Sequence, residues 1–417
     1  QGCNYLLPLI TFPYLSRVLH PAGLGAVVFA QTIGVIISVA VEYGFDFSGT
    51  REVARFSKDP ARLQSTVAGI LGAKVMLAGA ALLAAFVIRP FTLHIAPSPA
   101  LFWASTVWGV AQGINMLWYF QGLQRMAWSG GLDVAGKVIA TLSIFVFVHS
   151  PEDGWKVMAA QAVGCTVAHA ISFFMAHREI GFRWPTRQMV WDALRFGWPI
   201  FLFKASQLLM SATNSLMLGF LGTLQAVGLF GGVDKIRTVA SQSLWPVSQA
   251  LFPHQSNRVT EDVEAGARTV RRSLLLIGGL SAVFGVVLAA GAPLIVRLVL
   301  GAAYLPAVPA LRIFGLIVPL ITCAGILCFQ WMLPLGLDRE FNFVVFTAGL
   351  VNVAGGLALA PKFGVTGMAI AVTLSEVYAL IGFDTALRRK GLSPLGRYGG
   401  SVKNSRLELA IGTEAGR

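Results

Sequence analysis

Charged residues are scarce in this sequence. Asp, Glu, Lys and Arg make up 12% of its 417 residues, about half the share that is usual in soluble domains. Hydrophobic residues make up 55%, and the mean hydropathy is +0.70. These values exclude an ordinary soluble domain. Since an apolar helix needs about 20 residues to cross a bilayer, the length allows about a dozen spans. The composition therefore predicts an all-α polytopic membrane protein.

Catalytic and nucleotide-binding motifs are also missing. The sequence contains no Walker-type glycine loop, no Gly-x-Ser-x-Gly and no His-Glu-x-x-His. Cys3, Cys165, Cys323 and Cys328 lie in apolar runs without metal-ligand spacing, so they are interpreted as small core residues. We expect no cofactor, no metal site and no disulfide. Energy would come from a gradient, with coupling to H+ or Na+ left open, or from the substrate itself.

Long apolar windows are what the sequence does have. Bounded by charges or by Gly and Pro clusters, they predict about twelve spans. The spans cover residues 1–15, 26–43, 65–88, 101–120, 133–149, 155–176, 198–221, 227–252, 273–296, 313–335, 342–360 and 365–386. The chain opens at Gln1, already inside an apolar run, so we expect further residues before it.

Basic residues predict the orientation of these spans. They gather after the second, sixth, eighth and twelfth spans: Arg51, Arg55, Lys58, Arg62; Arg178, Arg183, Arg187, Arg195; Arg258, Arg268, Arg271, Arg272; Arg388, Arg389, Lys390, Arg397. Because cytoplasmic loops retain Lys and Arg, both termini are predicted to be cytoplasmic. The same rule explains most of the net charge of +13 without a nucleic-acid partner.

A weak internal similarity predicts two halves. A shift of about 203 residues lays 24–33 (LGAVVFAQTI) over 227–236 (VGLFGGVDKI), as in transporters built from parallel repeats. The predicted organisation is an N-terminal six-helix bundle (1–177), a cytoplasmic amphipathic linker (178–197), a C-terminal six-helix bundle (198–390) and a cytoplasmic tail (391–417). A central vestibule would lie between the two bundles.

Charged residues within or beside the spans are the candidate site residues, because a charge near a helix centre costs about 2.5 to 3.5 kcal/mol. The basic candidates for a cationic vestibule and its mouth are Arg51, Arg55, Lys74, Lys137, Lys204, Lys235 and Arg237. The acidic candidates for ion coupling or charge pairing are Glu42, Asp46, Asp234 and Glu376. The cationic excess favours an anionic substrate with a phosphate or pyrophosphate group.

Several of these candidates have structural alternatives. Lys137 and Lys204 are close enough to a span end to snorkel to the surface. Asp234 and Arg237 are three residues apart on one helix face and could neutralise each other. Trp118, Tyr119 and Phe120 are interpreted as an interfacial aromatic belt. Four uncharged side chains suit either sugar hydroxyls or contacts between helices: Gln112, Asn115, Gln207 and Asn214.

Three motifs carry a family resemblance. Residues 9–19 (LITFPYLSRVL), 43–54 (YGFDFSGTREVA) and 118–123 (WYFQGL) resemble bacterial polysaccharide-unit flippases of the Wzx type. These flippases belong to the multidrug/oligosaccharidyl-lipid/polysaccharide exporter superfamily. The likeness continues through residues 233–236 (VDKI) and 363–367 (FGVTG) and so covers nearly the whole chain.

The resemblance implies a MATE-like fold, with two six-helix bundles around a central vestibule. It implies that a polyprenyl-pyrophosphate-linked oligosaccharide moves from the inner to the outer leaflet of the bacterial cytoplasmic membrane by alternating access. The product pathway would be surface polysaccharide such as the O-antigen of lipopolysaccharide. Expected partners are this lipid-linked oligosaccharide, membrane lipids, and a polymerase and chain-length regulator of the same pathway. Many members carry Glu at the position of Gln124, so no role for that acid is assumed here.

Two alternatives stay open. A cation-coupled multidrug antiporter of the same superfamily would need carboxylates in the first, second or seventh span, where only Glu42 stands at a span end. An O-antigen polymerase or ligase would need a large external loop, yet the longest one predicted, residues 89–100, has about a dozen residues. The prediction is therefore a transporter and not an enzyme.

Overall fold

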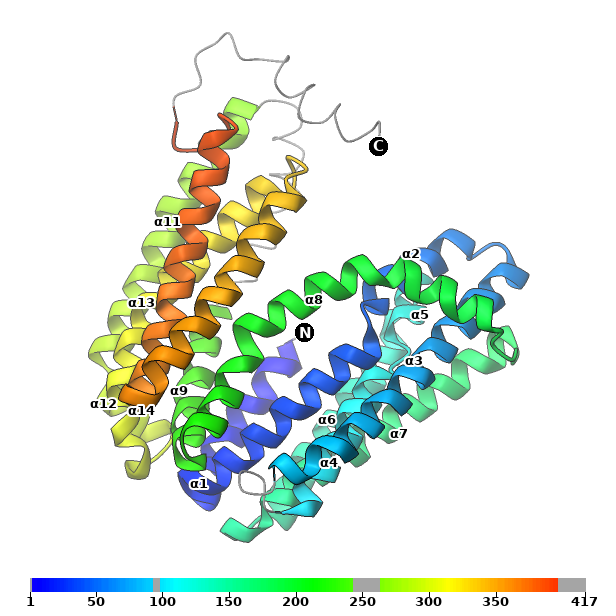
Figure 1. Ribbon diagram of the computed structural model, residues 1–417, viewed down its shortest axis with the longest axis horizontal. Helices are drawn as coiled ribbons and strands as arrows, with labels where there is room; N and C mark the ends of the chain where they lie inside the picture. Colours follow the sequence, from blue (N-terminus) through cyan, green and yellow to red (C-terminus); the bar gives the residue numbers. More distant parts are fainter. Residues whose placement is uncertain (1, 93–97, 243–262, 397–417) are drawn as a thin grey trace. The chain divides into compact units, whose positions relative to one another are not determined.

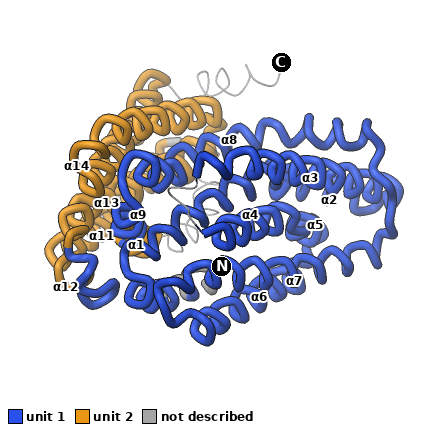
Figure 2. The backbone as a smooth tube through the Cα atoms, turned by 60° about the horizontal axis from the view of Figure 1, so that its bottom comes forward, with its two compact units in different colours: residues 1–232, 297–305 blue, residues 233–296, 306–417 orange. Residues whose placement is uncertain are grey.

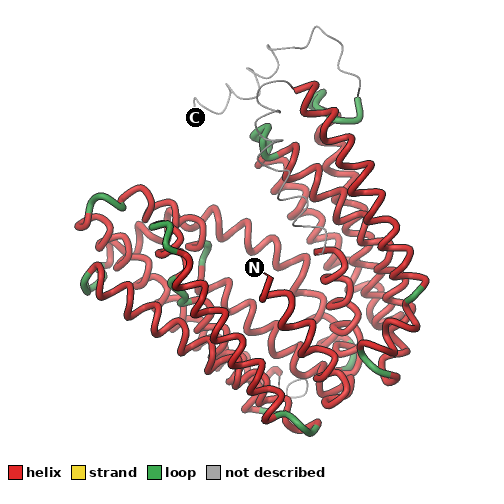
Figure 3. Tube along the Cα trace, turned by 180° about the vertical axis from the view of Figure 1, so that it is seen from behind, coloured by secondary structure: helices red, strands yellow, loops and turns green. Residues whose placement is uncertain are grey.

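A computed structural model describes residues 2–92, 98–242 and 263–396 of the chain (Figure 1). Within these ranges the chain forms helices and short connections and no strand (Figure 3). Seven of the described stretches are long and apolar enough to cross a membrane. The all-α, membrane-spanning class is thus confirmed, and a total of about twelve spans fits the helix order.

The helices follow one another with short links. They are α1 (Gly2–Glu42), α2 (Phe45–Phe56), α3 (Pro60–Ile88), α4 (Pro99–Gly113), α5 (Leu117–Gly122), α6 (Met126–Phe147), α7 (Gly154–Ile180), α8 (Arg187–Leu221), α9 (Leu224–Gln242), α11 (Val263–Ala290), α12 (Ala292–Val299), α13 (Val308–Leu327) and α14 (Asp338–Arg389). Short 3₁₀ turns cover Arg89–Thr92, Pro151–Asp153 and Ala302–Ala307, and a π turn covers Cys328–Met332.

Two long helices are each broken at one residue. In α1 the break is at His20 (φ 55°, ψ 172°), where the following Pro21 disfavours helical geometry and supplies no N–H. In α14 it is at Gly364 (φ 54°, ψ −128°), a conformation that glycine adopts with little strain. Predicted spans 1–15 and 26–43 lie on the two parts of α1, and 342–360 and 365–386 on the two parts of α14. The predicted loops between them shrink to a single residue each.

The chain forms two compact units (Figure 2). Unit 1 comprises Gln1–Gly232 and Arg297–Leu305, and unit 2 comprises Val233–Val296 and Pro306–Arg417. The boundaries therefore fall within α9, within α12 and within the 3₁₀ turn Ala302–Ala307. The domain boundaries expected from the sequence stay a prediction. The predicted linker, 178–197, holds the end of α7, residues 181–186 and the first turns of α8. Residues 397–417 of the predicted tail, the end of span 227–252 and Arg258 lie outside the described residues.

Unit 1 is a bundle in which small residues allow close helix crossings. Helix α1 packs on α4 and α8, α4 packs on α7, and α6 packs on α7. At the α6–α7 crossing, a Cβ added to Gly136 would lie 2.6 Å from the carbonyl oxygen of Gly164. Such small-residue contacts are typical of membrane helices, because van der Waals packing holds them together.

Small residues also allow close helix crossings in unit 2. Its α11 packs on α13, and α13 packs on α14. A Cβ added to Gly315 of α13 would lie 2.6 Å from the carbonyl oxygen of Gly285 of α11. The two backbones therefore approach more closely than any larger side chain would permit.

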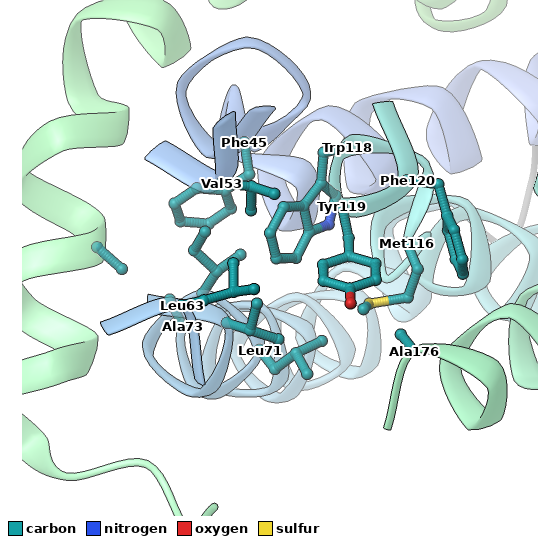
Figure 4. Packing of buried hydrophobic residues seen from close by; sticks show 13 residues of the cluster. Phe45, Val53, Leu63, Leu71, Ala73, Met116, Trp118, Tyr119, Phe120 and Ala176 are labelled. Carbon is teal, nitrogen blue, oxygen red and sulfur yellow. The ribbon is translucent and has the colours of Figure 1, made fainter. Parts of the chain in front are cut away.

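A buried aromatic core joins α2, α3 and α5 (Figure 4). Trp118, Tyr119 and Phe120 of α5 are 0%, 1% and 3% exposed and pack beside Phe45 and Val53 of α2 (Figure 4). The prediction that these aromatics form an interfacial belt is wrong. The break between α4 and α5 turns them inward, and the Thr50 hydroxyl of α2 donates to the Trp118 carbonyl oxygen at 3.1 Å.

Candidate functional site

Two carboxylates and one lysine meet where α1 passes into α2. The Lys204 Nζ of α8 lies 2.8 Å from Glu42 Oε2 and 2.6 Å from Asp46 Oδ2. Glu42 is the last residue of α1, and Asp46 stands in the first turn of α2. The side chains of Lys204, Glu42 and Asp46 keep 18%, 20% and 29% of their surface exposed. We call these three residues the Lys204 cluster.

A tight turn forms the Lys204 cluster. Tyr43 and Gly44 both have positive φ, 52° and 76°, which reverses the chain and brings the two carboxylates to one side. A Cβ added to Gly44 would lie 2.6 Å from Cγ2 of Ile200. Glycine therefore lets α8 approach the turn, and Lys204 follows Ile200 by about one helical turn on the same face. This explains part of the glycine and acidic pattern of residues 43–54.

One carboxylate oxygen of the Lys204 cluster lacks a hydrogen bond within the described part of the chain. Asp46 Oδ1 is buried and has no hydrogen-bond partner in the ranges that the structure describes. The Lys204 Nζ also stands 5.8 Å from the Phe47 ring centroid, within range of a cation–π contact. One ammonium thus serves two carboxylates, and one carboxylate oxygen is left over.

Lys74 of α3 is fully buried, at 0% exposure. Its Nζ donates to the Asn115 carbonyl oxygen at 2.9 Å and lies 5.7 Å from the Trp118 ring centroid. Among the described residues it forms no ion pair with a carboxylate, although Glu42 and Asp46 act on it through longer-range electrostatics. Together with the Lys204 cluster it makes a group of two cations and two anions.

The residues of the predicted mouth lie on α2. Arg51 Nε is 3.7 Å from Glu52 Oε1, and the Arg51 side chain is 70% exposed. Arg55 is exposed and stands 5.4 Å over the Phe56 ring centroid. Exposed guanidinium groups on one short helix can bind a phosphate and can equally well face solvent.

Lys137 of α6 lies elsewhere in unit 1. Its Nζ is 2.7 Å from Asp133 Oδ2, and both residues line a cavity of 310 Å³. His169 of α7 approaches the same carboxylate, with Nε2 at 3.9 Å from Asp133 Oδ1. Sequence reasoning missed Asp133 and His169. The four-residue spacing between Asp133 and Lys137 was the available signal for the first.

The predicted residues of unit 2 form a smaller group. Arg237 is 2.8 Å from Asp234 Oδ1, so the two residues form the ion pair that their spacing left open. The Arg237 guanidinium also stands 5.5 Å from the Phe314 ring centroid, and it acts electrostatically on Glu376 of α14. Lys235 interacts electrostatically with Asp234, but it forms no ion pair within 4 Å in the described part of the chain.

These pairings reduce the cationic excess. Four predicted cations have a carboxylate within 4 Å: Arg51, Lys137, Lys204 and Arg237. Arg55, Lys74 and Lys235 have none among the residues described. Of these, Lys74 is the one that is completely buried. The site roles of all eleven predicted residues stay predictions.

Comparison with known proteins identifies the family. The model of a family described as "Polysaccharide biosynthesis protein" matches residues 1–258, which include all three motifs. The chain belongs to this family. The predicted resemblance to polysaccharide-unit flippases of the Wzx type is therefore confirmed.

Named relatives match nearly the whole chain. A protein named "Putative O-antigen transporter" from Escherichia coli (strain K12) is 27% identical over 381 residues, 90% of this chain and 91% of its own length. One of the same name from Shigella dysenteriae is 27% identical over 395 residues, 91% and 96% of the two chains.

Solved structures share the fold of this family member. The inward closed conformation of the lipid II flippase MurJ has a TM-score of 0.76, 12% identity, and coverage of 92% of this chain and 85% of its own. An inward-facing multidrug resistance MATE family transporter of the MOP superfamily has a TM-score of 0.66, 15% identity, and coverage of 94% and 100%. The MATE-like fold is confirmed. The prediction of a multi-pass membrane transporter and not an enzyme is confirmed as well.

Proposed function

We propose that this protein moves polyprenyl-pyrophosphate-linked oligosaccharide repeat units from the inner to the outer leaflet of the bacterial cytoplasmic membrane, by alternating access. The observation that carries the proposal is the family match over residues 1–258. The names of the two relatives support it, and so does the likeness in fold to a lipid II flippase. O-antigen or a related surface polysaccharide would be the product. A polymerase and a chain-length regulator would act next.

The pyrophosphate would be held in turn by cations on α2, α3 and α9, of which Arg51 also pairs with Glu52. Arg51 and Arg55 on α2 would receive it at the cytoplasmic side, with both termini on that side. Lys74 would then attract it electrostatically, because this ammonium is buried and contacts a carbonyl oxygen instead of an acid. Buried charge acts at longer range than charge in water. Lys235 would play the same part in unit 2, whereas Arg237 is occupied by Asp234.

If a gradient drives the transport cycle, the coupling ion would bind at Glu42 and Asp46. Both are carboxylates at the α1–α2 turn, and Asp46 Oδ1 is buried without a partner in the described structure. H+ or Na+ at that oxygen would compete with Lys204 for the same carboxylate. Release of Lys204 would free α8 from the turn.

A cation-coupled multidrug antiporter is the second candidate, favoured by the likeness to MATE transporters and by the same pair of carboxylates. A cationic drug would need acidic groups that are not already neutralised. Here Lys204 contacts both carboxylates, and Lys74 lies within electrostatic range of them. Both carboxylates are therefore already opposed by cations, so they are less suited to hold a cationic drug.

The experiment is complementation of a bacterial strain that lacks its own repeat-unit flippase. Expression of this protein should restore surface polysaccharide and clear the lipid-linked units that accumulate inside. Lys74→Met should lower surface display about tenfold or more, whereas Lys74→Arg should retain most of it, with equal membrane abundance of both variants. The Lys74→Glu, Lys235→Glu double variant should be inactive.

Two results would overturn the proposal. One is full surface display by the double charge-reversal variant at normal abundance, which would remove the electrostatic mechanism. The other is no complementation by the wild-type protein together with drug resistance in an efflux-deficient strain, which would favour the antiporter.

A further inference from the structure

The polar cavity beside Lys137 lies entirely within unit 1, among α1, α4, α6 and α7. Its volume is 310 Å³, at the lower end of the range for small-molecule pockets. Its lining comprises Leu7, Thr11, Gln31, Trp108, Gln112, Asp133, Gly136, Lys137, Ala140, Thr141, Ile144, Gln161 and Cys165. More than half of these side chains are polar, which is unusual inside a membrane bundle.

Three glutamines from three helices line this cavity. Gln31 comes from α1, Gln112 from α4 and Gln161 from α7. None of the three side chains has a hydrogen-bond partner in the described part of the chain. Their amide atoms are not fully buried, so each keeps some accessible surface. Amides within membrane helices normally bond across helices, and an uncompensated one is costly.

The charges in the cavity cancel. The Asp133 and Lys137 side chains form an ion pair at 2.7 Å, and they are the Asp and Lys of the lining. An anion such as pyrophosphate would meet the Asp133 carboxylate, and a cation would meet the Lys137 ammonium. The cavity thus offers many donors and acceptors with no net charge, which suits an uncharged polyhydroxylated ligand.

An indole ring completes the wall. Trp108 of α4 is half-buried, and its ring packs on α1, where a Cβ added to Gly34 would lie 2.7 Å from the ring atom Cε3. Glycine at position 34 therefore fixes how close the ring sits to α1. An indole has an apolar face and a polar N–H, and a sugar ring has a C–H face and a hydroxyl rim that match them.

We propose that this cavity binds one uncharged sugar residue of the transported oligosaccharide. Each glutamine amide both donates and accepts, so the three can bind vicinal hydroxyls from different sides while Trp108 covers the ring face. The inference rests on the proposed function and adds to it. The pyrophosphate is recognised by cations elsewhere, and the sugar is recognised in the N-terminal unit.

The binding test uses purified protein in detergent and radiolabelled oligosaccharide released by mild acid from the host's lipid-linked pool. We expect the Gln31→Leu, Gln112→Leu, Gln161→Leu triple variant to bind about tenfold more weakly or worse, since each lost hydrogen bond contributes modestly. Gln188→Leu, an exposed glutamine of α8 outside the cavity, should bind within twofold of wild type. Sodium pyrophosphate should not compete.

Folding is checked on the same samples by gel filtration and thermal unfolding. If the triple variant does not fold, a second comparison uses two variants at position 108. Trp108→Phe keeps an aromatic ring and should retain binding, whereas Trp108→Leu should lose it. Wild-type binding by a folded triple variant, or displacement by pyrophosphate, would overturn the sugar site.

Transport separates the two proposals. If the wild-type protein complements the flippase-deficient strain, and if the folded triple variant exports polysaccharide at the wild-type level, the sugar site is disproved. The flippase function is then supported. If the wild-type protein does not complement the strain, but binds the released oligosaccharide more tightly than the triple variant does, the flippase function is disproved. The sugar site is then supported.

Discussion

Two regions of unit 1 treat their polar groups in opposite ways. In the aromatic core of Figure 4, the Trp118 indole N–H donates to the Asn115 carbonyl oxygen at 3.0 Å, and the Tyr119 hydroxyl donates to Glu179 Oε2 at 3.1 Å. In the polar cavity, the amides of Gln31, Gln112 and Gln161 have no such partner among the described residues.

This difference distinguishes polar groups that stabilise the fold from polar groups that can bind a ligand. A buried polar group that is bonded within the protein stabilises one fold, whereas an accessible one without a partner leaves hydrogen-bonding capacity for a ligand. The WYFQGL motif is the more conspicuous sequence, yet its aromatics are core residues. Isolated glutamines on separate helices form the better candidate site.

The largest expected effect is in the core. Trp118→Ala should lower the free energy of unfolding by about 3 to 5 kcal/mol, because it empties a fully packed site. Thermal unfolding in detergent measures the loss. Trp128→Ala is the matched control, since Trp128 is 71% exposed. Equal losses for the two variants would contradict the packing in Figure 4.

The next effect is at the Lys204 cluster. Lys204→Met should cost about 3 kcal/mol of unfolding free energy, near the lower end for breaking a buried pair, since it leaves two adjacent carboxylates unopposed. The variant that also carries Glu42→Gln and Asp46→Asn should recover most of the loss. A Lys204→Met protein as stable as wild type would show that the cluster is not formed.

Lys74 should behave differently from Lys204. Lys74→Met removes a buried ammonium that contacts a carbonyl and no acid, so the change in unfolding free energy should stay within about 1 kcal/mol, while surface polysaccharide falls. The two lysine variants are compared in one unfolding series. A loss for Lys74→Met as large as that for Lys204→Met would assign Lys74 a structural role instead.

The smallest effect on stability is expected in the cavity. Gln112→Leu should change the unfolding free energy by about 0.5 kcal/mol or less, as for a substitution that breaks no existing contact. Gln64→Leu is the contrast, because the Gln64 side chain donates to the Ile180 carbonyl oxygen at 3.0 Å, and it should cost about 1 kcal/mol. A larger loss for Gln112→Leu would mean that its amide is bonded within the protein.

Much of the fold was predictable from local patterns. Apolar length identified the spans, and the motifs identified the family. The i,i+3 spacing of Asp234 and Arg237 identified their pairing, because it lies within one helix. The single-residue breaks at His20 and Gly364 were not found, since the apolar windows left wider loops there.

The site was harder to predict because its contacts are distant in sequence. Glu42 and Lys204 are 162 residues apart, and no local period brings them together. Gln112 was noted as a group for sugar hydroxyls, but Gln31 and Gln161 were not, since a single glutamine in a span usually contacts another helix. Their convergence depends on how α1, α4 and α7 pack.

Flippase activity is measured most sharply as translocation in vesicles that contain the purified protein. Lipid-pyrophosphate-linked repeat units are incorporated into both leaflets, and an impermeant oxidant outside attacks the sugars of the outer leaflet. With the protein present, the oxidised fraction should rise with time from the outer-leaflet share to nearly the whole pool, and it should rise more slowly with Lys74→Met. An oxidised fraction that stays at the level of protein-free vesicles would contradict a flippase function.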